Sequence, residues 1–439
     1  MLVLCSCSVA APRPRATTDL MPGSPLAMLV AGVPMLALLA SCASEPSNDA
    51  PPDAGTSDAT SEATPDTGHD ALDDTLSDGS GPEDGMPDVT DPQDAADATE
   101  ASVGWAPYGL LSLNLHCLKL TGTSFTSHQQ RFEAIAQAAA AENVSAITAQ
   151  ELCATSGVDA LSSLRQALED ATGETWSTAF ALAHVAWEGT ADEADEGVGL
   201  LVRGPLSDVV ELDYASQAGL RRVAVIGRLP AKLGGFRLAS IHLDHVDAEV
   251  REAQARQTAS ALLALADPAR DLLVAGDFNA KPGSPALLAM AEFGYVELTS
   301  SLGADRIDHV LAHRASAVVA NSAVVVFDGT IYPAVSDHPG MLVRIAPSVG
   351  QDVAITRLRA DATVAAGEFL SVRGDALPLS WSKGWPAWRE PSGTWKLVLT
   401  EIASGSPFAY KFLRNDVDWQ TGDNASATGG ADHVVVPSF

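Results

Sequence analysis

Polar residues lie at or near the ends of apolar runs in the middle of the sequence, and their types could do chemistry together. In one such place the apolar run 272–275 is followed by Gly276, which permits close backbone approach, and then by Asp277 and Asn279. Asp277 and Asn279 share a strand parity, so we expect them to point to the same side. The complete set is Asn114, Glu151, His242, Asp277, Asn279, Asp308, Asp337 and His338. Because side chains at strand ends commonly form the active sites of layered α/β proteins, we expect these residues to share one site.

The oxygen-bearing members of this set predict a metal site. Carboxylate and amide oxygens without a cluster of cysteines and histidines suit a hard cation, so we expect Mg²⁺ or Mn²⁺. Mg²⁺ keeps several waters and typically takes one or two protein carboxylates. Glu151 is therefore the first candidate ligand, with Asp337 and Asn114 as candidates to join it.

The histidines predict proton transfer beside the metal. An imidazole titrates near neutral pH, and an aspartate next to it can fix its tautomer and stabilise its protonated form. A metal, a His-Asp pair and amide donors together suit the attack of water on phosphorus, where catalysis consists chiefly of positioning and charge stabilisation.

Each of these residues also has an ordinary structural explanation when it is taken alone. Asn114 could cap a turn, Glu151 could be a surface carboxylate, and His242 and His338 could be satisfied structural histidines. The segment GDFN could be a turn that follows a strand. The joint occurrence of the motifs in one chain order is far more specific than any one of them.

The elements that would position these residues alternate between helices and strands. Apolar residues at helical spacing predict helices at residues 128–144, 157–173, 248–266 and 284–294. Short apolar runs predict strands at residues 109–115, 145–152, 176–185, 197–204, 221–230, 236–244, 271–278, 306–314, 323–328 and 340–346. Two mixed sheets packed face to face, with helices outside, satisfy this order.

The motifs SLNLH, AQE, IHLDH, GDFNA, RIDHV and SDHPG resemble those of the endonuclease/exonuclease/phosphatase superfamily. That superfamily includes nucleases of the deoxyribonuclease I type, inositol-polyphosphate phosphatases and bacterial sphingomyelinases. The resemblance covers about residues 105–347 and implies a four-layer α/β/β/α sandwich, which agrees with the predicted elements.

The resemblance also implies roles for the metal-binding residues. Glu151 is similar to the principal metal ligand of the family, Asn114 would support the metal site, and Asp337 would be a second ligand. Two residues after the first Asn, some relatives have an acidic ligand where this chain has His116, which weakens a two-metal assignment.

The remaining roles concern water and phosphate. By the same resemblance, His338 would be the catalytic base or a phosphate contact and would be held by Asp308. Asp277 and Asn279 would position the attacking water and the phosphate, and His242 would bind or protonate the phosphate oxygens. The motif VREAQ, with Arg251 and Gln254, matches a recurrent R-x-x-Q pattern that we interpret as structural support for a loop.

The charge of the central segment does not favour a long nucleic acid as substrate. Residues 106–347 contain sixteen Lys and Arg against twenty-eight Asp and Glu, a net charge of −12, whereas long duplexes usually bind a basic face. The only basic doublet, Arg221-Arg222, is explained by a solvated strand end, and no obvious apolar hairpin indicates a lipid surface. The phosphate ester of a nucleic acid, of a phospholipid or of a small molecule remains open as the substrate.

Residues 348–439 predict a small all-β sandwich, because short strands alternate there without a helical pattern. The runs LSVRGDALPLSWSKGWPA, GTWKLVLTEI and FAYKFLRNDVDWQTGDN resemble a starch- or glycogen-binding module. The resemblance implies that an α-glucan-like polysaccharide is bound by Trp381, Lys411, Trp419 and Asn424, since flat aromatic faces suit sugar rings. Tryptophans in the core of a plain spacer domain are the alternative.

Residues 1–42 predict an export signal. Arg13 and Arg15 precede the apolar run LAMLVAGVPMLALLA, which is short for a membrane span. The ending Leu-Ala-Ser-Cys at Cys42 resembles a bacterial lipoprotein box, in which the cysteine is lipidated. We therefore expect an exported protein with a lipid anchor in the cell envelope, at the outer membrane or cell surface; an ordinary secretory signal is the alternative.

Residues 43–104 predict a disordered acidic linker. Seventeen Asp and Glu and no Lys or Arg lie between Cys42 and Ala106, and such a segment cannot bury enough apolar surface to offset the entropy of ordering. An acidic interaction tail is the alternative.

Cys117 and Cys153 are the cysteines of the predicted folded part, and each follows a strand-like run. In an exported chain, neighbouring strands would allow a disulfide between them, and two free thiols are the alternative.

The sequence therefore predicts an exported, metal-dependent phosphoesterase with a carbohydrate-binding accessory domain. One alternative is a surface carbohydrate-binding lipoprotein whose phosphoesterase-like domain is catalytically silent. The other is an inert structural lipoprotein, which leaves the polar residues at the strand ends unexplained. The oligomeric state is not indicated.

Overall fold

The computed structural model describes residues 104–266 and 271–439. The predicted export signal, Cys42 and the acidic linker up to residue 103 lie outside the described residues. Within the described ranges, no helix combines the length and the apolar character that crossing a bilayer requires.

Two six-stranded mixed sheets form the centre of the fold. The first has the strand order β11-β12-β1-β2-β4-β3, and the second has the order β5-β6-β7-β8-β10-β9. The strands of the first sheet are β1 (Tyr108–Asn114), β2 (Val144–Ala154), β3 (Trp176–Ala186), β4 (Ala194–Arg203), β11 (Val318–Val326) and β12 (Gly340–Pro347). Those of the second are β5 (Ser207–Asp213), β6 (Val223–Arg228), β7 (Arg237–His242), β8 (Leu272–Asp277), β9 (Tyr295–Glu297) and β10 (Asp308–His313).

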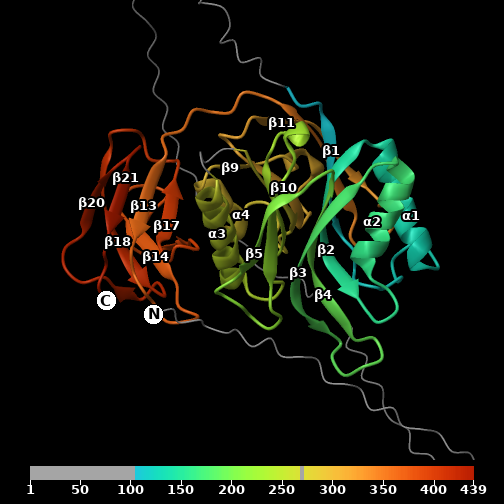
Figure 1. Cartoon of the computed structure of the whole chain (residues 1–439), viewed down its shortest axis with the longest axis horizontal. Coiled ribbons are helices and arrows are strands. Elements are labelled where there is room, and N and C mark those ends of the chain that lie inside the picture. The colour runs from blue at the N-terminus through green and yellow to red at the C-terminus, as the bar shows by residue number, and fades with distance from the viewer. Residues whose placement is uncertain (1–103, 267–270) are drawn as a thin grey trace, which may run out of the picture. The chain divides into compact units, whose positions relative to one another are not determined.

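Helices cover the outer face of each sheet, so the predicted four-layer α/β/β/α sandwich is confirmed (Figure 1). The helices α1 (His128–Ala141) and α2 (Ala160–Thr172) pack on the first sheet, and α3 (Ala248–Leu265) and α4 (Pro285–Glu292) pack on the second. Short 3₁₀ turns lie at Ala231–Leu233 and Ser300–Leu302.

Strand β8 shows why these apolar runs become central strands. Leu272 and Val274 belong to the core beneath the α3–α4 layer, whereas Leu273 and Ala275 belong to the core between the two sheets. Successive side chains of a strand point to opposite faces, so a strand that is covered on both faces must be apolar throughout. Most polar residues of the site therefore lie where such strands begin or end.

The helices begin and end at residues that supply their own caps. Asp159 accepts a hydrogen bond from the backbone N–H of Ser162 at the start of α2, and Gly173 ends that helix with a left-handed φ of 67°. Asp247 accepts hydrogen bonds from two backbone N–H groups at the start of α3. These side chains satisfy donors that a helix leaves unpaired at its first turn.

The last part of the chain is all β, as predicted. One sheet has the order β16-β17-β13-β21, and the other has the order β15-β14-β18-β19 with β20 paired to β18. The strands are β13 (Thr356–Ala360), β14 (Leu370–Gly374), β15 (Trp385–Pro386), β16 (Trp388–Arg389), β17 (Trp395–Leu399), β18 (Pro407–Arg414), β19 (Asp418–Trp419), β20 (Ala425–Thr428) and β21 (Asp432–Val435).

Strand β5 was not predicted from the sequence and β11 was predicted only in part, and their composition explains why. Strand β5 is a mostly exposed edge strand that contains three acidic residues, so it lacks an apolar run. Strand β11 begins five residues before the predicted start, because its exposed and half-buried residues alternate on the outer edge of the first sheet. Edge strands are paired on one side only and carry a weaker hydrophobic signal.

The β-sandwich shares a hydrophobic core with the α3–α4 layer. The Trp385 ring stacks on Phe293 of the turn after α4, with ring centroids 3.7 Å apart, and the Arg256 guanidinium lies 4.0 Å from the Trp385 centroid. The Ser260 hydroxyl donates to the carbonyl of Pro386. Trp385 is therefore a packing residue, not a sugar contact.

Cys117 and Cys153 form a disulfide, and both residues are buried. The bridge joins the loop after β1 to the end of β2, which is the neighbouring parallel strand.

His313 connects β10 to the β-sandwich as a buried, neutral imidazole. Its Nδ1 accepts a hydrogen bond from the N–H of Ala315 at 3.2 Å, so its Nε2 donates to the Thr400 hydroxyl at 3.1 Å. Burial, reinforced by the charge of Arg314, lowers the pKa of His313 to about 4. Arg314 itself pairs with Glu401 of the sandwich at 2.8 Å.

We expect mild acid to destabilise the folded protein through His313. The unfolded chain binds a proton at this residue near pH 6.5, whereas the folded chain binds it near pH 4. Between these values the unfolded state holds more protons, so the free energy of unfolding falls as the pH decreases, by up to about 3 kcal/mol.

Denaturant unfolding at a series of pH values from 7 to 4 tests this expectation. The variant His313→Gln should lose this part of the pH dependence, and His433→Gln, at the half-exposed His433 of β21, should keep it. Parallel pH profiles for the wild type and His313→Gln would contradict the expectation.

Candidate active site

Strand direction and register collect the polar residues at one edge of the two sheets. Strands β7 and β8 are parallel, and their last residues His242 and Asp277 are paired in register. Strand β10 runs antiparallel to β8 and begins at Asp308, which is paired with Asp277. In the first sheet, β1 ends at Asn114 and β12 begins shortly after His338 on the antiparallel neighbour.

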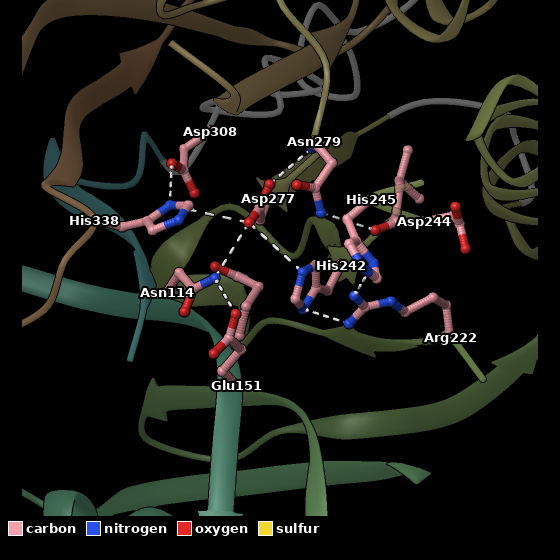
Figure 2. A network of polar contacts seen from close by, with 12 residues as sticks. Asn114, Glu151, Arg222, His242, Asp244, His245, Asp277, Asn279, Asp308 and His338 are labelled. Atoms are coloured by element: carbon pink, nitrogen blue, oxygen red, sulfur yellow. Dashed lines mark hydrogen bonds and ion pairs between the residues drawn. The ribbon is translucent and has the colours of Figure 1, made fainter. Parts of the chain in front are cut away.

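The carboxylate of Asp277 is the point at which these groups meet (Figure 2). Its Oδ2 accepts a hydrogen bond from Asn114 Nδ2 at 3.1 Å, and it lies 3.6 Å from His242 Nε2 and 3.9 Å from His338 Nδ1. Asp277 is only 1% exposed. One buried oxygen therefore connects the two sheets.

The backbone at the end of β8 requires a glycine. Gly276 has a φ of 150°, and a Cβ atom there would lie 2.1 Å from the carbonyl oxygen of Ile241 in β7. The close approach predicted at this position is confirmed, and it lets β7 and β8 deliver His242 and Asp277 side by side.

Asn279 reaches the site by a different route from the predicted one. Strand β8 ends at Asp277, so strand alternation does not place Asn279. Instead Asn279 adopts a left-handed φ of 48°, and its N–H donates to Asp277 Oδ1 at 2.7 Å. Its side-chain Nδ2 donates to the carbonyl of Leu243 at 3.0 Å. The prediction of a shared strand parity was wrong, although the two residues are neighbours.

Asn114 bridges two carboxylates. Its Nδ2 donates to Glu151 Oε1 at 2.9 Å as well as to Asp277, and its Oδ1 accepts the N–H of His116 at 2.9 Å. In this structure Asn114 therefore supports the carboxylates as a donor, and its oxygen is held by the backbone.

Glu151 lies in a β-bulge. The register between β2 and β4 shifts between Ala149 and Leu152, and Glu151 has a left-handed φ of 48°. Bulges are common beside active sites because they redirect one side chain of a strand. A second shift, between Leu182 and His184 of β3, lies on the opposite side of β4 and brings His184 to 3.6 Å from Glu196.

His338 is positioned and charged by Asp308. Its Nδ1 lies 3.0 Å from Asp308 Oδ2. Burial alone would lower the pKa of His338, but the hydrogen bond to Asp308 and the charges of Asp308 and Asp277 raise it to about 9. His338 is therefore an imidazolium at neutral pH, which favours a phosphate contact over a base in the state described here.

The donor set fits a hard cation. Burial and the neighbouring Asp308 raise the pKa of Asp277 to about 7, and Asp308 Oδ1 is buried without a hydrogen-bond partner among the described residues. Ligand atoms of Asp277, Asp308 and His338 lie within 4.8 Å of one another. A buried carboxylate oxygen of Asp308 without a partner in the described ranges, close to Asp277 and in the same network as Glu151, is typical of a Mg²⁺ or Mn²⁺ site.

Asp337 is the one predicted ligand that the structure does not bring to Glu151. Its carboxylate lies 3.3 Å from His116 Nδ1 and accepts a hydrogen bond from the Ser336 hydroxyl. Its side chain is 45% exposed. Within the described residues, Asp337 has no direct contact with Glu151 or Asn114.

Arg222 is a site residue that the sequence analysis missed. It is 4% exposed, so the interpretation of the doublet as a solvated strand end was wrong for this member. Its Nη1 lies 3.0 Å from His242 Nδ1 and its Nη2 lies 3.2 Å from His245 Nδ1. Arg221 does lie at the surface, where it pairs with Asp213.

Glu196 was also missed. It lies 3.9 Å from Arg222, and burial together with the charge of Glu151 raises its pKa to about 7. The sequence signal for this region is the pair of glycines at 197 and 199. A Cβ on Gly197 would lie 2.1 Å from the carbonyl oxygen of Ala181, and glycine inside a strand often marks a bulge.

The loop after β7 has the support that the R-x-x-Q pattern predicts. Arg251 donates to the carbonyl of Asp244 at 2.9 Å, and Gln254 Oε1 accepts the Asp244 N–H at 2.8 Å. Gln254 also donates to the carbonyl of Ser216 at 2.9 Å. These contacts hold the loop that carries His245.

Two of the predicted sugar-binding residues lie together on the β-sandwich. The rings of Trp381 and Trp419 are 37% and 42% exposed, with centroids 6.2 Å apart and planes tilted by 34°. Lys411 Nζ donates to the carbonyls of Gln420 and Gly422, so it supports the turn after Trp419. Asn424 is exposed at the start of β20.

Solved structures with a similar fold have low identity to this chain. An endonuclease/exonuclease/phosphatase from Beutenbergia cavernae is 16% identical to this chain, with a TM-score of 0.45. The match covers 74% of this chain and 100% of that protein. The mannosyl-6-phosphatase of Bacteroides thetaiotaomicron is 14% identical with a TM-score of 0.40, covering 54% and 99%. TDP2 of D. rerio, complexed with a single-strand DNA product, is 15% identical with a TM-score of 0.39, covering 54% and 98%.

No curated protein matches the chain. The family model described as "Endonuclease/Exonuclease/phosphatase family" matches residues 111–338, which is more than half of the 439 residues. The matched segment begins in β1, three residues before Asn114, and ends at His338, so it contains every residue of the hydrogen-bonded network around Asp277. The chain therefore belongs to the endonuclease/exonuclease/phosphatase family.

Proposed function

We propose that this chain is a divalent-metal-dependent phosphoesterase. The observation that carries the proposal is the buried oxygen of Asp277, shared by Asn114, His242 and His338 at one edge of the two sheets. A carboxylate, an amide and two histidines at that distance match what the attack of water on phosphorus requires.

Glu151 would hold the cation, Mg²⁺ or Mn²⁺, and Asn114 would support it by donating to the Glu151 carboxylate. Asp337, predicted as a second ligand, lies against His116 instead and has no part in this proposal. When bound, the cation would polarise the phosphate and stabilise its developing charge. Asn114 already fixes one oxygen of Glu151 through a 2.9 Å hydrogen bond, which leaves the other carboxylate oxygen free to bind.

The other residues of the site would contact the phosphate and position the attacking water. Asp308 orients the His338 imidazolium, whose positive charge attracts the phosphate oxygens. Asp277 accepts hydrogen bonds in a nearly dry environment and is the group that can hold the attacking water. The Asn279 backbone is tied to Asp277, which keeps its side chain at the same edge.

The substrate class is not chosen by these contacts. The net charge of −12 over residues 106–347 disfavours long duplexes, and a nucleic acid, a phospholipid and a small phosphate ester remain the candidates.

Substitution of the central groups should abolish hydrolysis. Purified protein with Mg²⁺ or Mn²⁺ is assayed against DNA, sphingomyelin, inositol phosphates and a chromogenic phosphodiester. His338→Asn and Glu151→Gln should each lower kcat/KM by about 100-fold or more, because they remove a phosphate contact and a metal ligand.

Matched substitutions outside the site control for general damage. Glu133→Gln on the exposed face of α1 and His433→Gln in β21 should retain wild-type rates. Undiminished activity in His338→Asn and Glu151→Gln would refute the proposed site. Inactivity of the wild type on every substrate with either metal would favour the alternative of a catalytically silent domain.

We also propose that the β-sandwich binds an α-glucan-like polysaccharide through Trp381 and Trp419. The support is the exposed pair of rings, with the Arg373 guanidinium 5.3 Å from the Trp419 centroid. Trp381→Ala and Trp419→Ala should each weaken binding to soluble amylose about tenfold in calorimetry, which corresponds to about 1.4 kcal/mol.

A matched control is Trp187→Ala, which removes a tryptophan of similar exposure on the β3–β4 hairpin of the catalytic part. It should leave amylose binding unchanged. Equal binding by the wild type and both sandwich variants would argue against this platform.

We further propose that the protein is exported and lipidated at Cys42, on the strength of the lipoprotein-like sequence alone. Expressed in a bacterium with labelled palmitate, the wild type should carry the label in the membrane fraction, and Cys42→Ser should not. Label retained by Cys42→Ser would contradict the anchor.

A further inference from the structure

The two ring nitrogens of His242 contact groups of opposite character. Nδ1 lies 3.0 Å from the Arg222 guanidinium, and Nε2 lies 3.6 Å from the Asp277 carboxylate (Figure 2). A guanidinium has donors and no acceptor, and it stays charged in proteins. Nδ1 of His242 must therefore accept, so the single proton of a neutral ring lies on Nε2 and faces the catalytic edge.

Arg222 is fixed in place for this contact. Its backbone N–H donates to Gln217 Oε1 at 2.8 Å, and its carbonyl accepts from Gln217 Nε2 at 2.9 Å. Its Nη2 lies 3.2 Å from His245 Nδ1, and its Nη1, besides contacting His242, lies 3.9 Å from Glu196 Oε1. A side chain that is held at its backbone and at both Nη atoms keeps one orientation.

We propose that Arg222 is a positioning residue that holds His242 as a neutral hydrogen-bond donor through Nε2–H. Of the two roles that the sequence left open for His242, binding and protonating the phosphate oxygens, this selects binding. The role towards phosphate rests on the proposed function, but the position of the proton does not.

The charges around His242 agree with a neutral ring. A second proton would lie against the cation of Arg222 inside a buried site, with the Asp277 carboxylate 3.6 Å from Nε2 and the Glu196 carboxylate 3.9 Å from Arg222 itself. The titratable and charged groups around His242 come from several elements and are Arg222, Asp277, Glu196, His338, His245 and His184.

The position of the proton can be measured without substrate. The full chain is labelled with ¹⁵N-histidine, and long-range ¹H–¹⁵N spectra are recorded from pH 5.5 to 8. The His242 signals are identified by their absence in His242→Asn. The expected result is an unprotonated Nδ1 and a protonated Nε2 throughout this range. In the wild-type spectra, a proton on Nδ1 or a doubly protonated ring at neutral pH would overturn the proposal without any variant.

Variants of the arginine doublet test the cause. Arg222→Met should give a mixture of tautomers or a protonated ring at the acid end, whereas Arg222→Lys, which also can only donate, should restore the wild-type pattern. Arg221→Met, at the exposed neighbour, is the matched control and should change nothing. A wild-type pattern in Arg222→Met would overturn the proposal. If Arg222→Met does not fold, the spectra of the wild type and of Arg222→Lys still test where the His242 proton lies.

Kinetics then separates this inference from the proposed function. On whichever phosphate ester is hydrolysed, Arg222→Met should lower kcat by about 10- to 100-fold, the size of effect seen when the partner that orients a metal-bound histidine is removed, and Arg222→Lys should recover most of the rate. If the spectra show the proton on Nε2 but the wild type hydrolyses no phosphate ester, the proposed function is refuted and the positioning role of Arg222 stands. Full phosphoesterase activity in a protein whose His242 proton lies on Nδ1 would support the proposed function and refute the positioning role of Arg222.

Discussion

The carboxylate of Asp277 is the group on which the rest of the site depends. It is buried, and its Oδ2 is approached both by Asn114 of the first sheet and by His242 of the second. Burying a charge is costly unless it is paired or hydrogen-bonded. The sandwich meets that requirement by aligning four strand ends, so the arrangement that satisfies Asp277 also assembles the polar groups of the candidate site.

The second constraint is geometric and lies in β4. Glu151 and His184 lie in the two strands that neighbour β4, and the side chains of these strands alternate between faces wherever the strands are regular. The register shifts on each side of β4 break that alternation, and Gly197 makes room where a Cβ would meet the Ala181 carbonyl. Glu151 thus adopts a strained, left-handed backbone conformation, and this conformation directs its side chain towards the site.

The sequence predicted the layers and most of the catalytic edge because both follow from local patterns. Continuous apolar runs identified β8 as a buried strand, and the polar residues at the strand ends indicated where the site lies. Arg222 was not identified as a site residue, because a basic doublet before a strand is usually solvated. Nothing in the local sequence shows that Gln217, His242 and His245 surround it in the fold. Asn279 was placed on the correct side for the wrong reason, because strand parity does not extend past the last residue of β8. Contacts that depend on loop closure or on bulges are not encoded in periodicity.

Two histidines face the same carboxylate, and their second partners differentiate them. His338 has Asp308 at its Nδ1, and this carboxylate stabilises a doubly protonated ring. His242 has Arg222 at its Nδ1, and burial with this cation holds the pKa of His242 well below its ordinary value. Environments that push the pKa values of two like groups apart are a general means of assigning different tasks to them. One imidazole thus supplies charge and the other supplies a directed donor, and the Asp277 carboxylate lies between them, 3.6 Å from His242 Nε2 and 3.9 Å from His338 Nδ1.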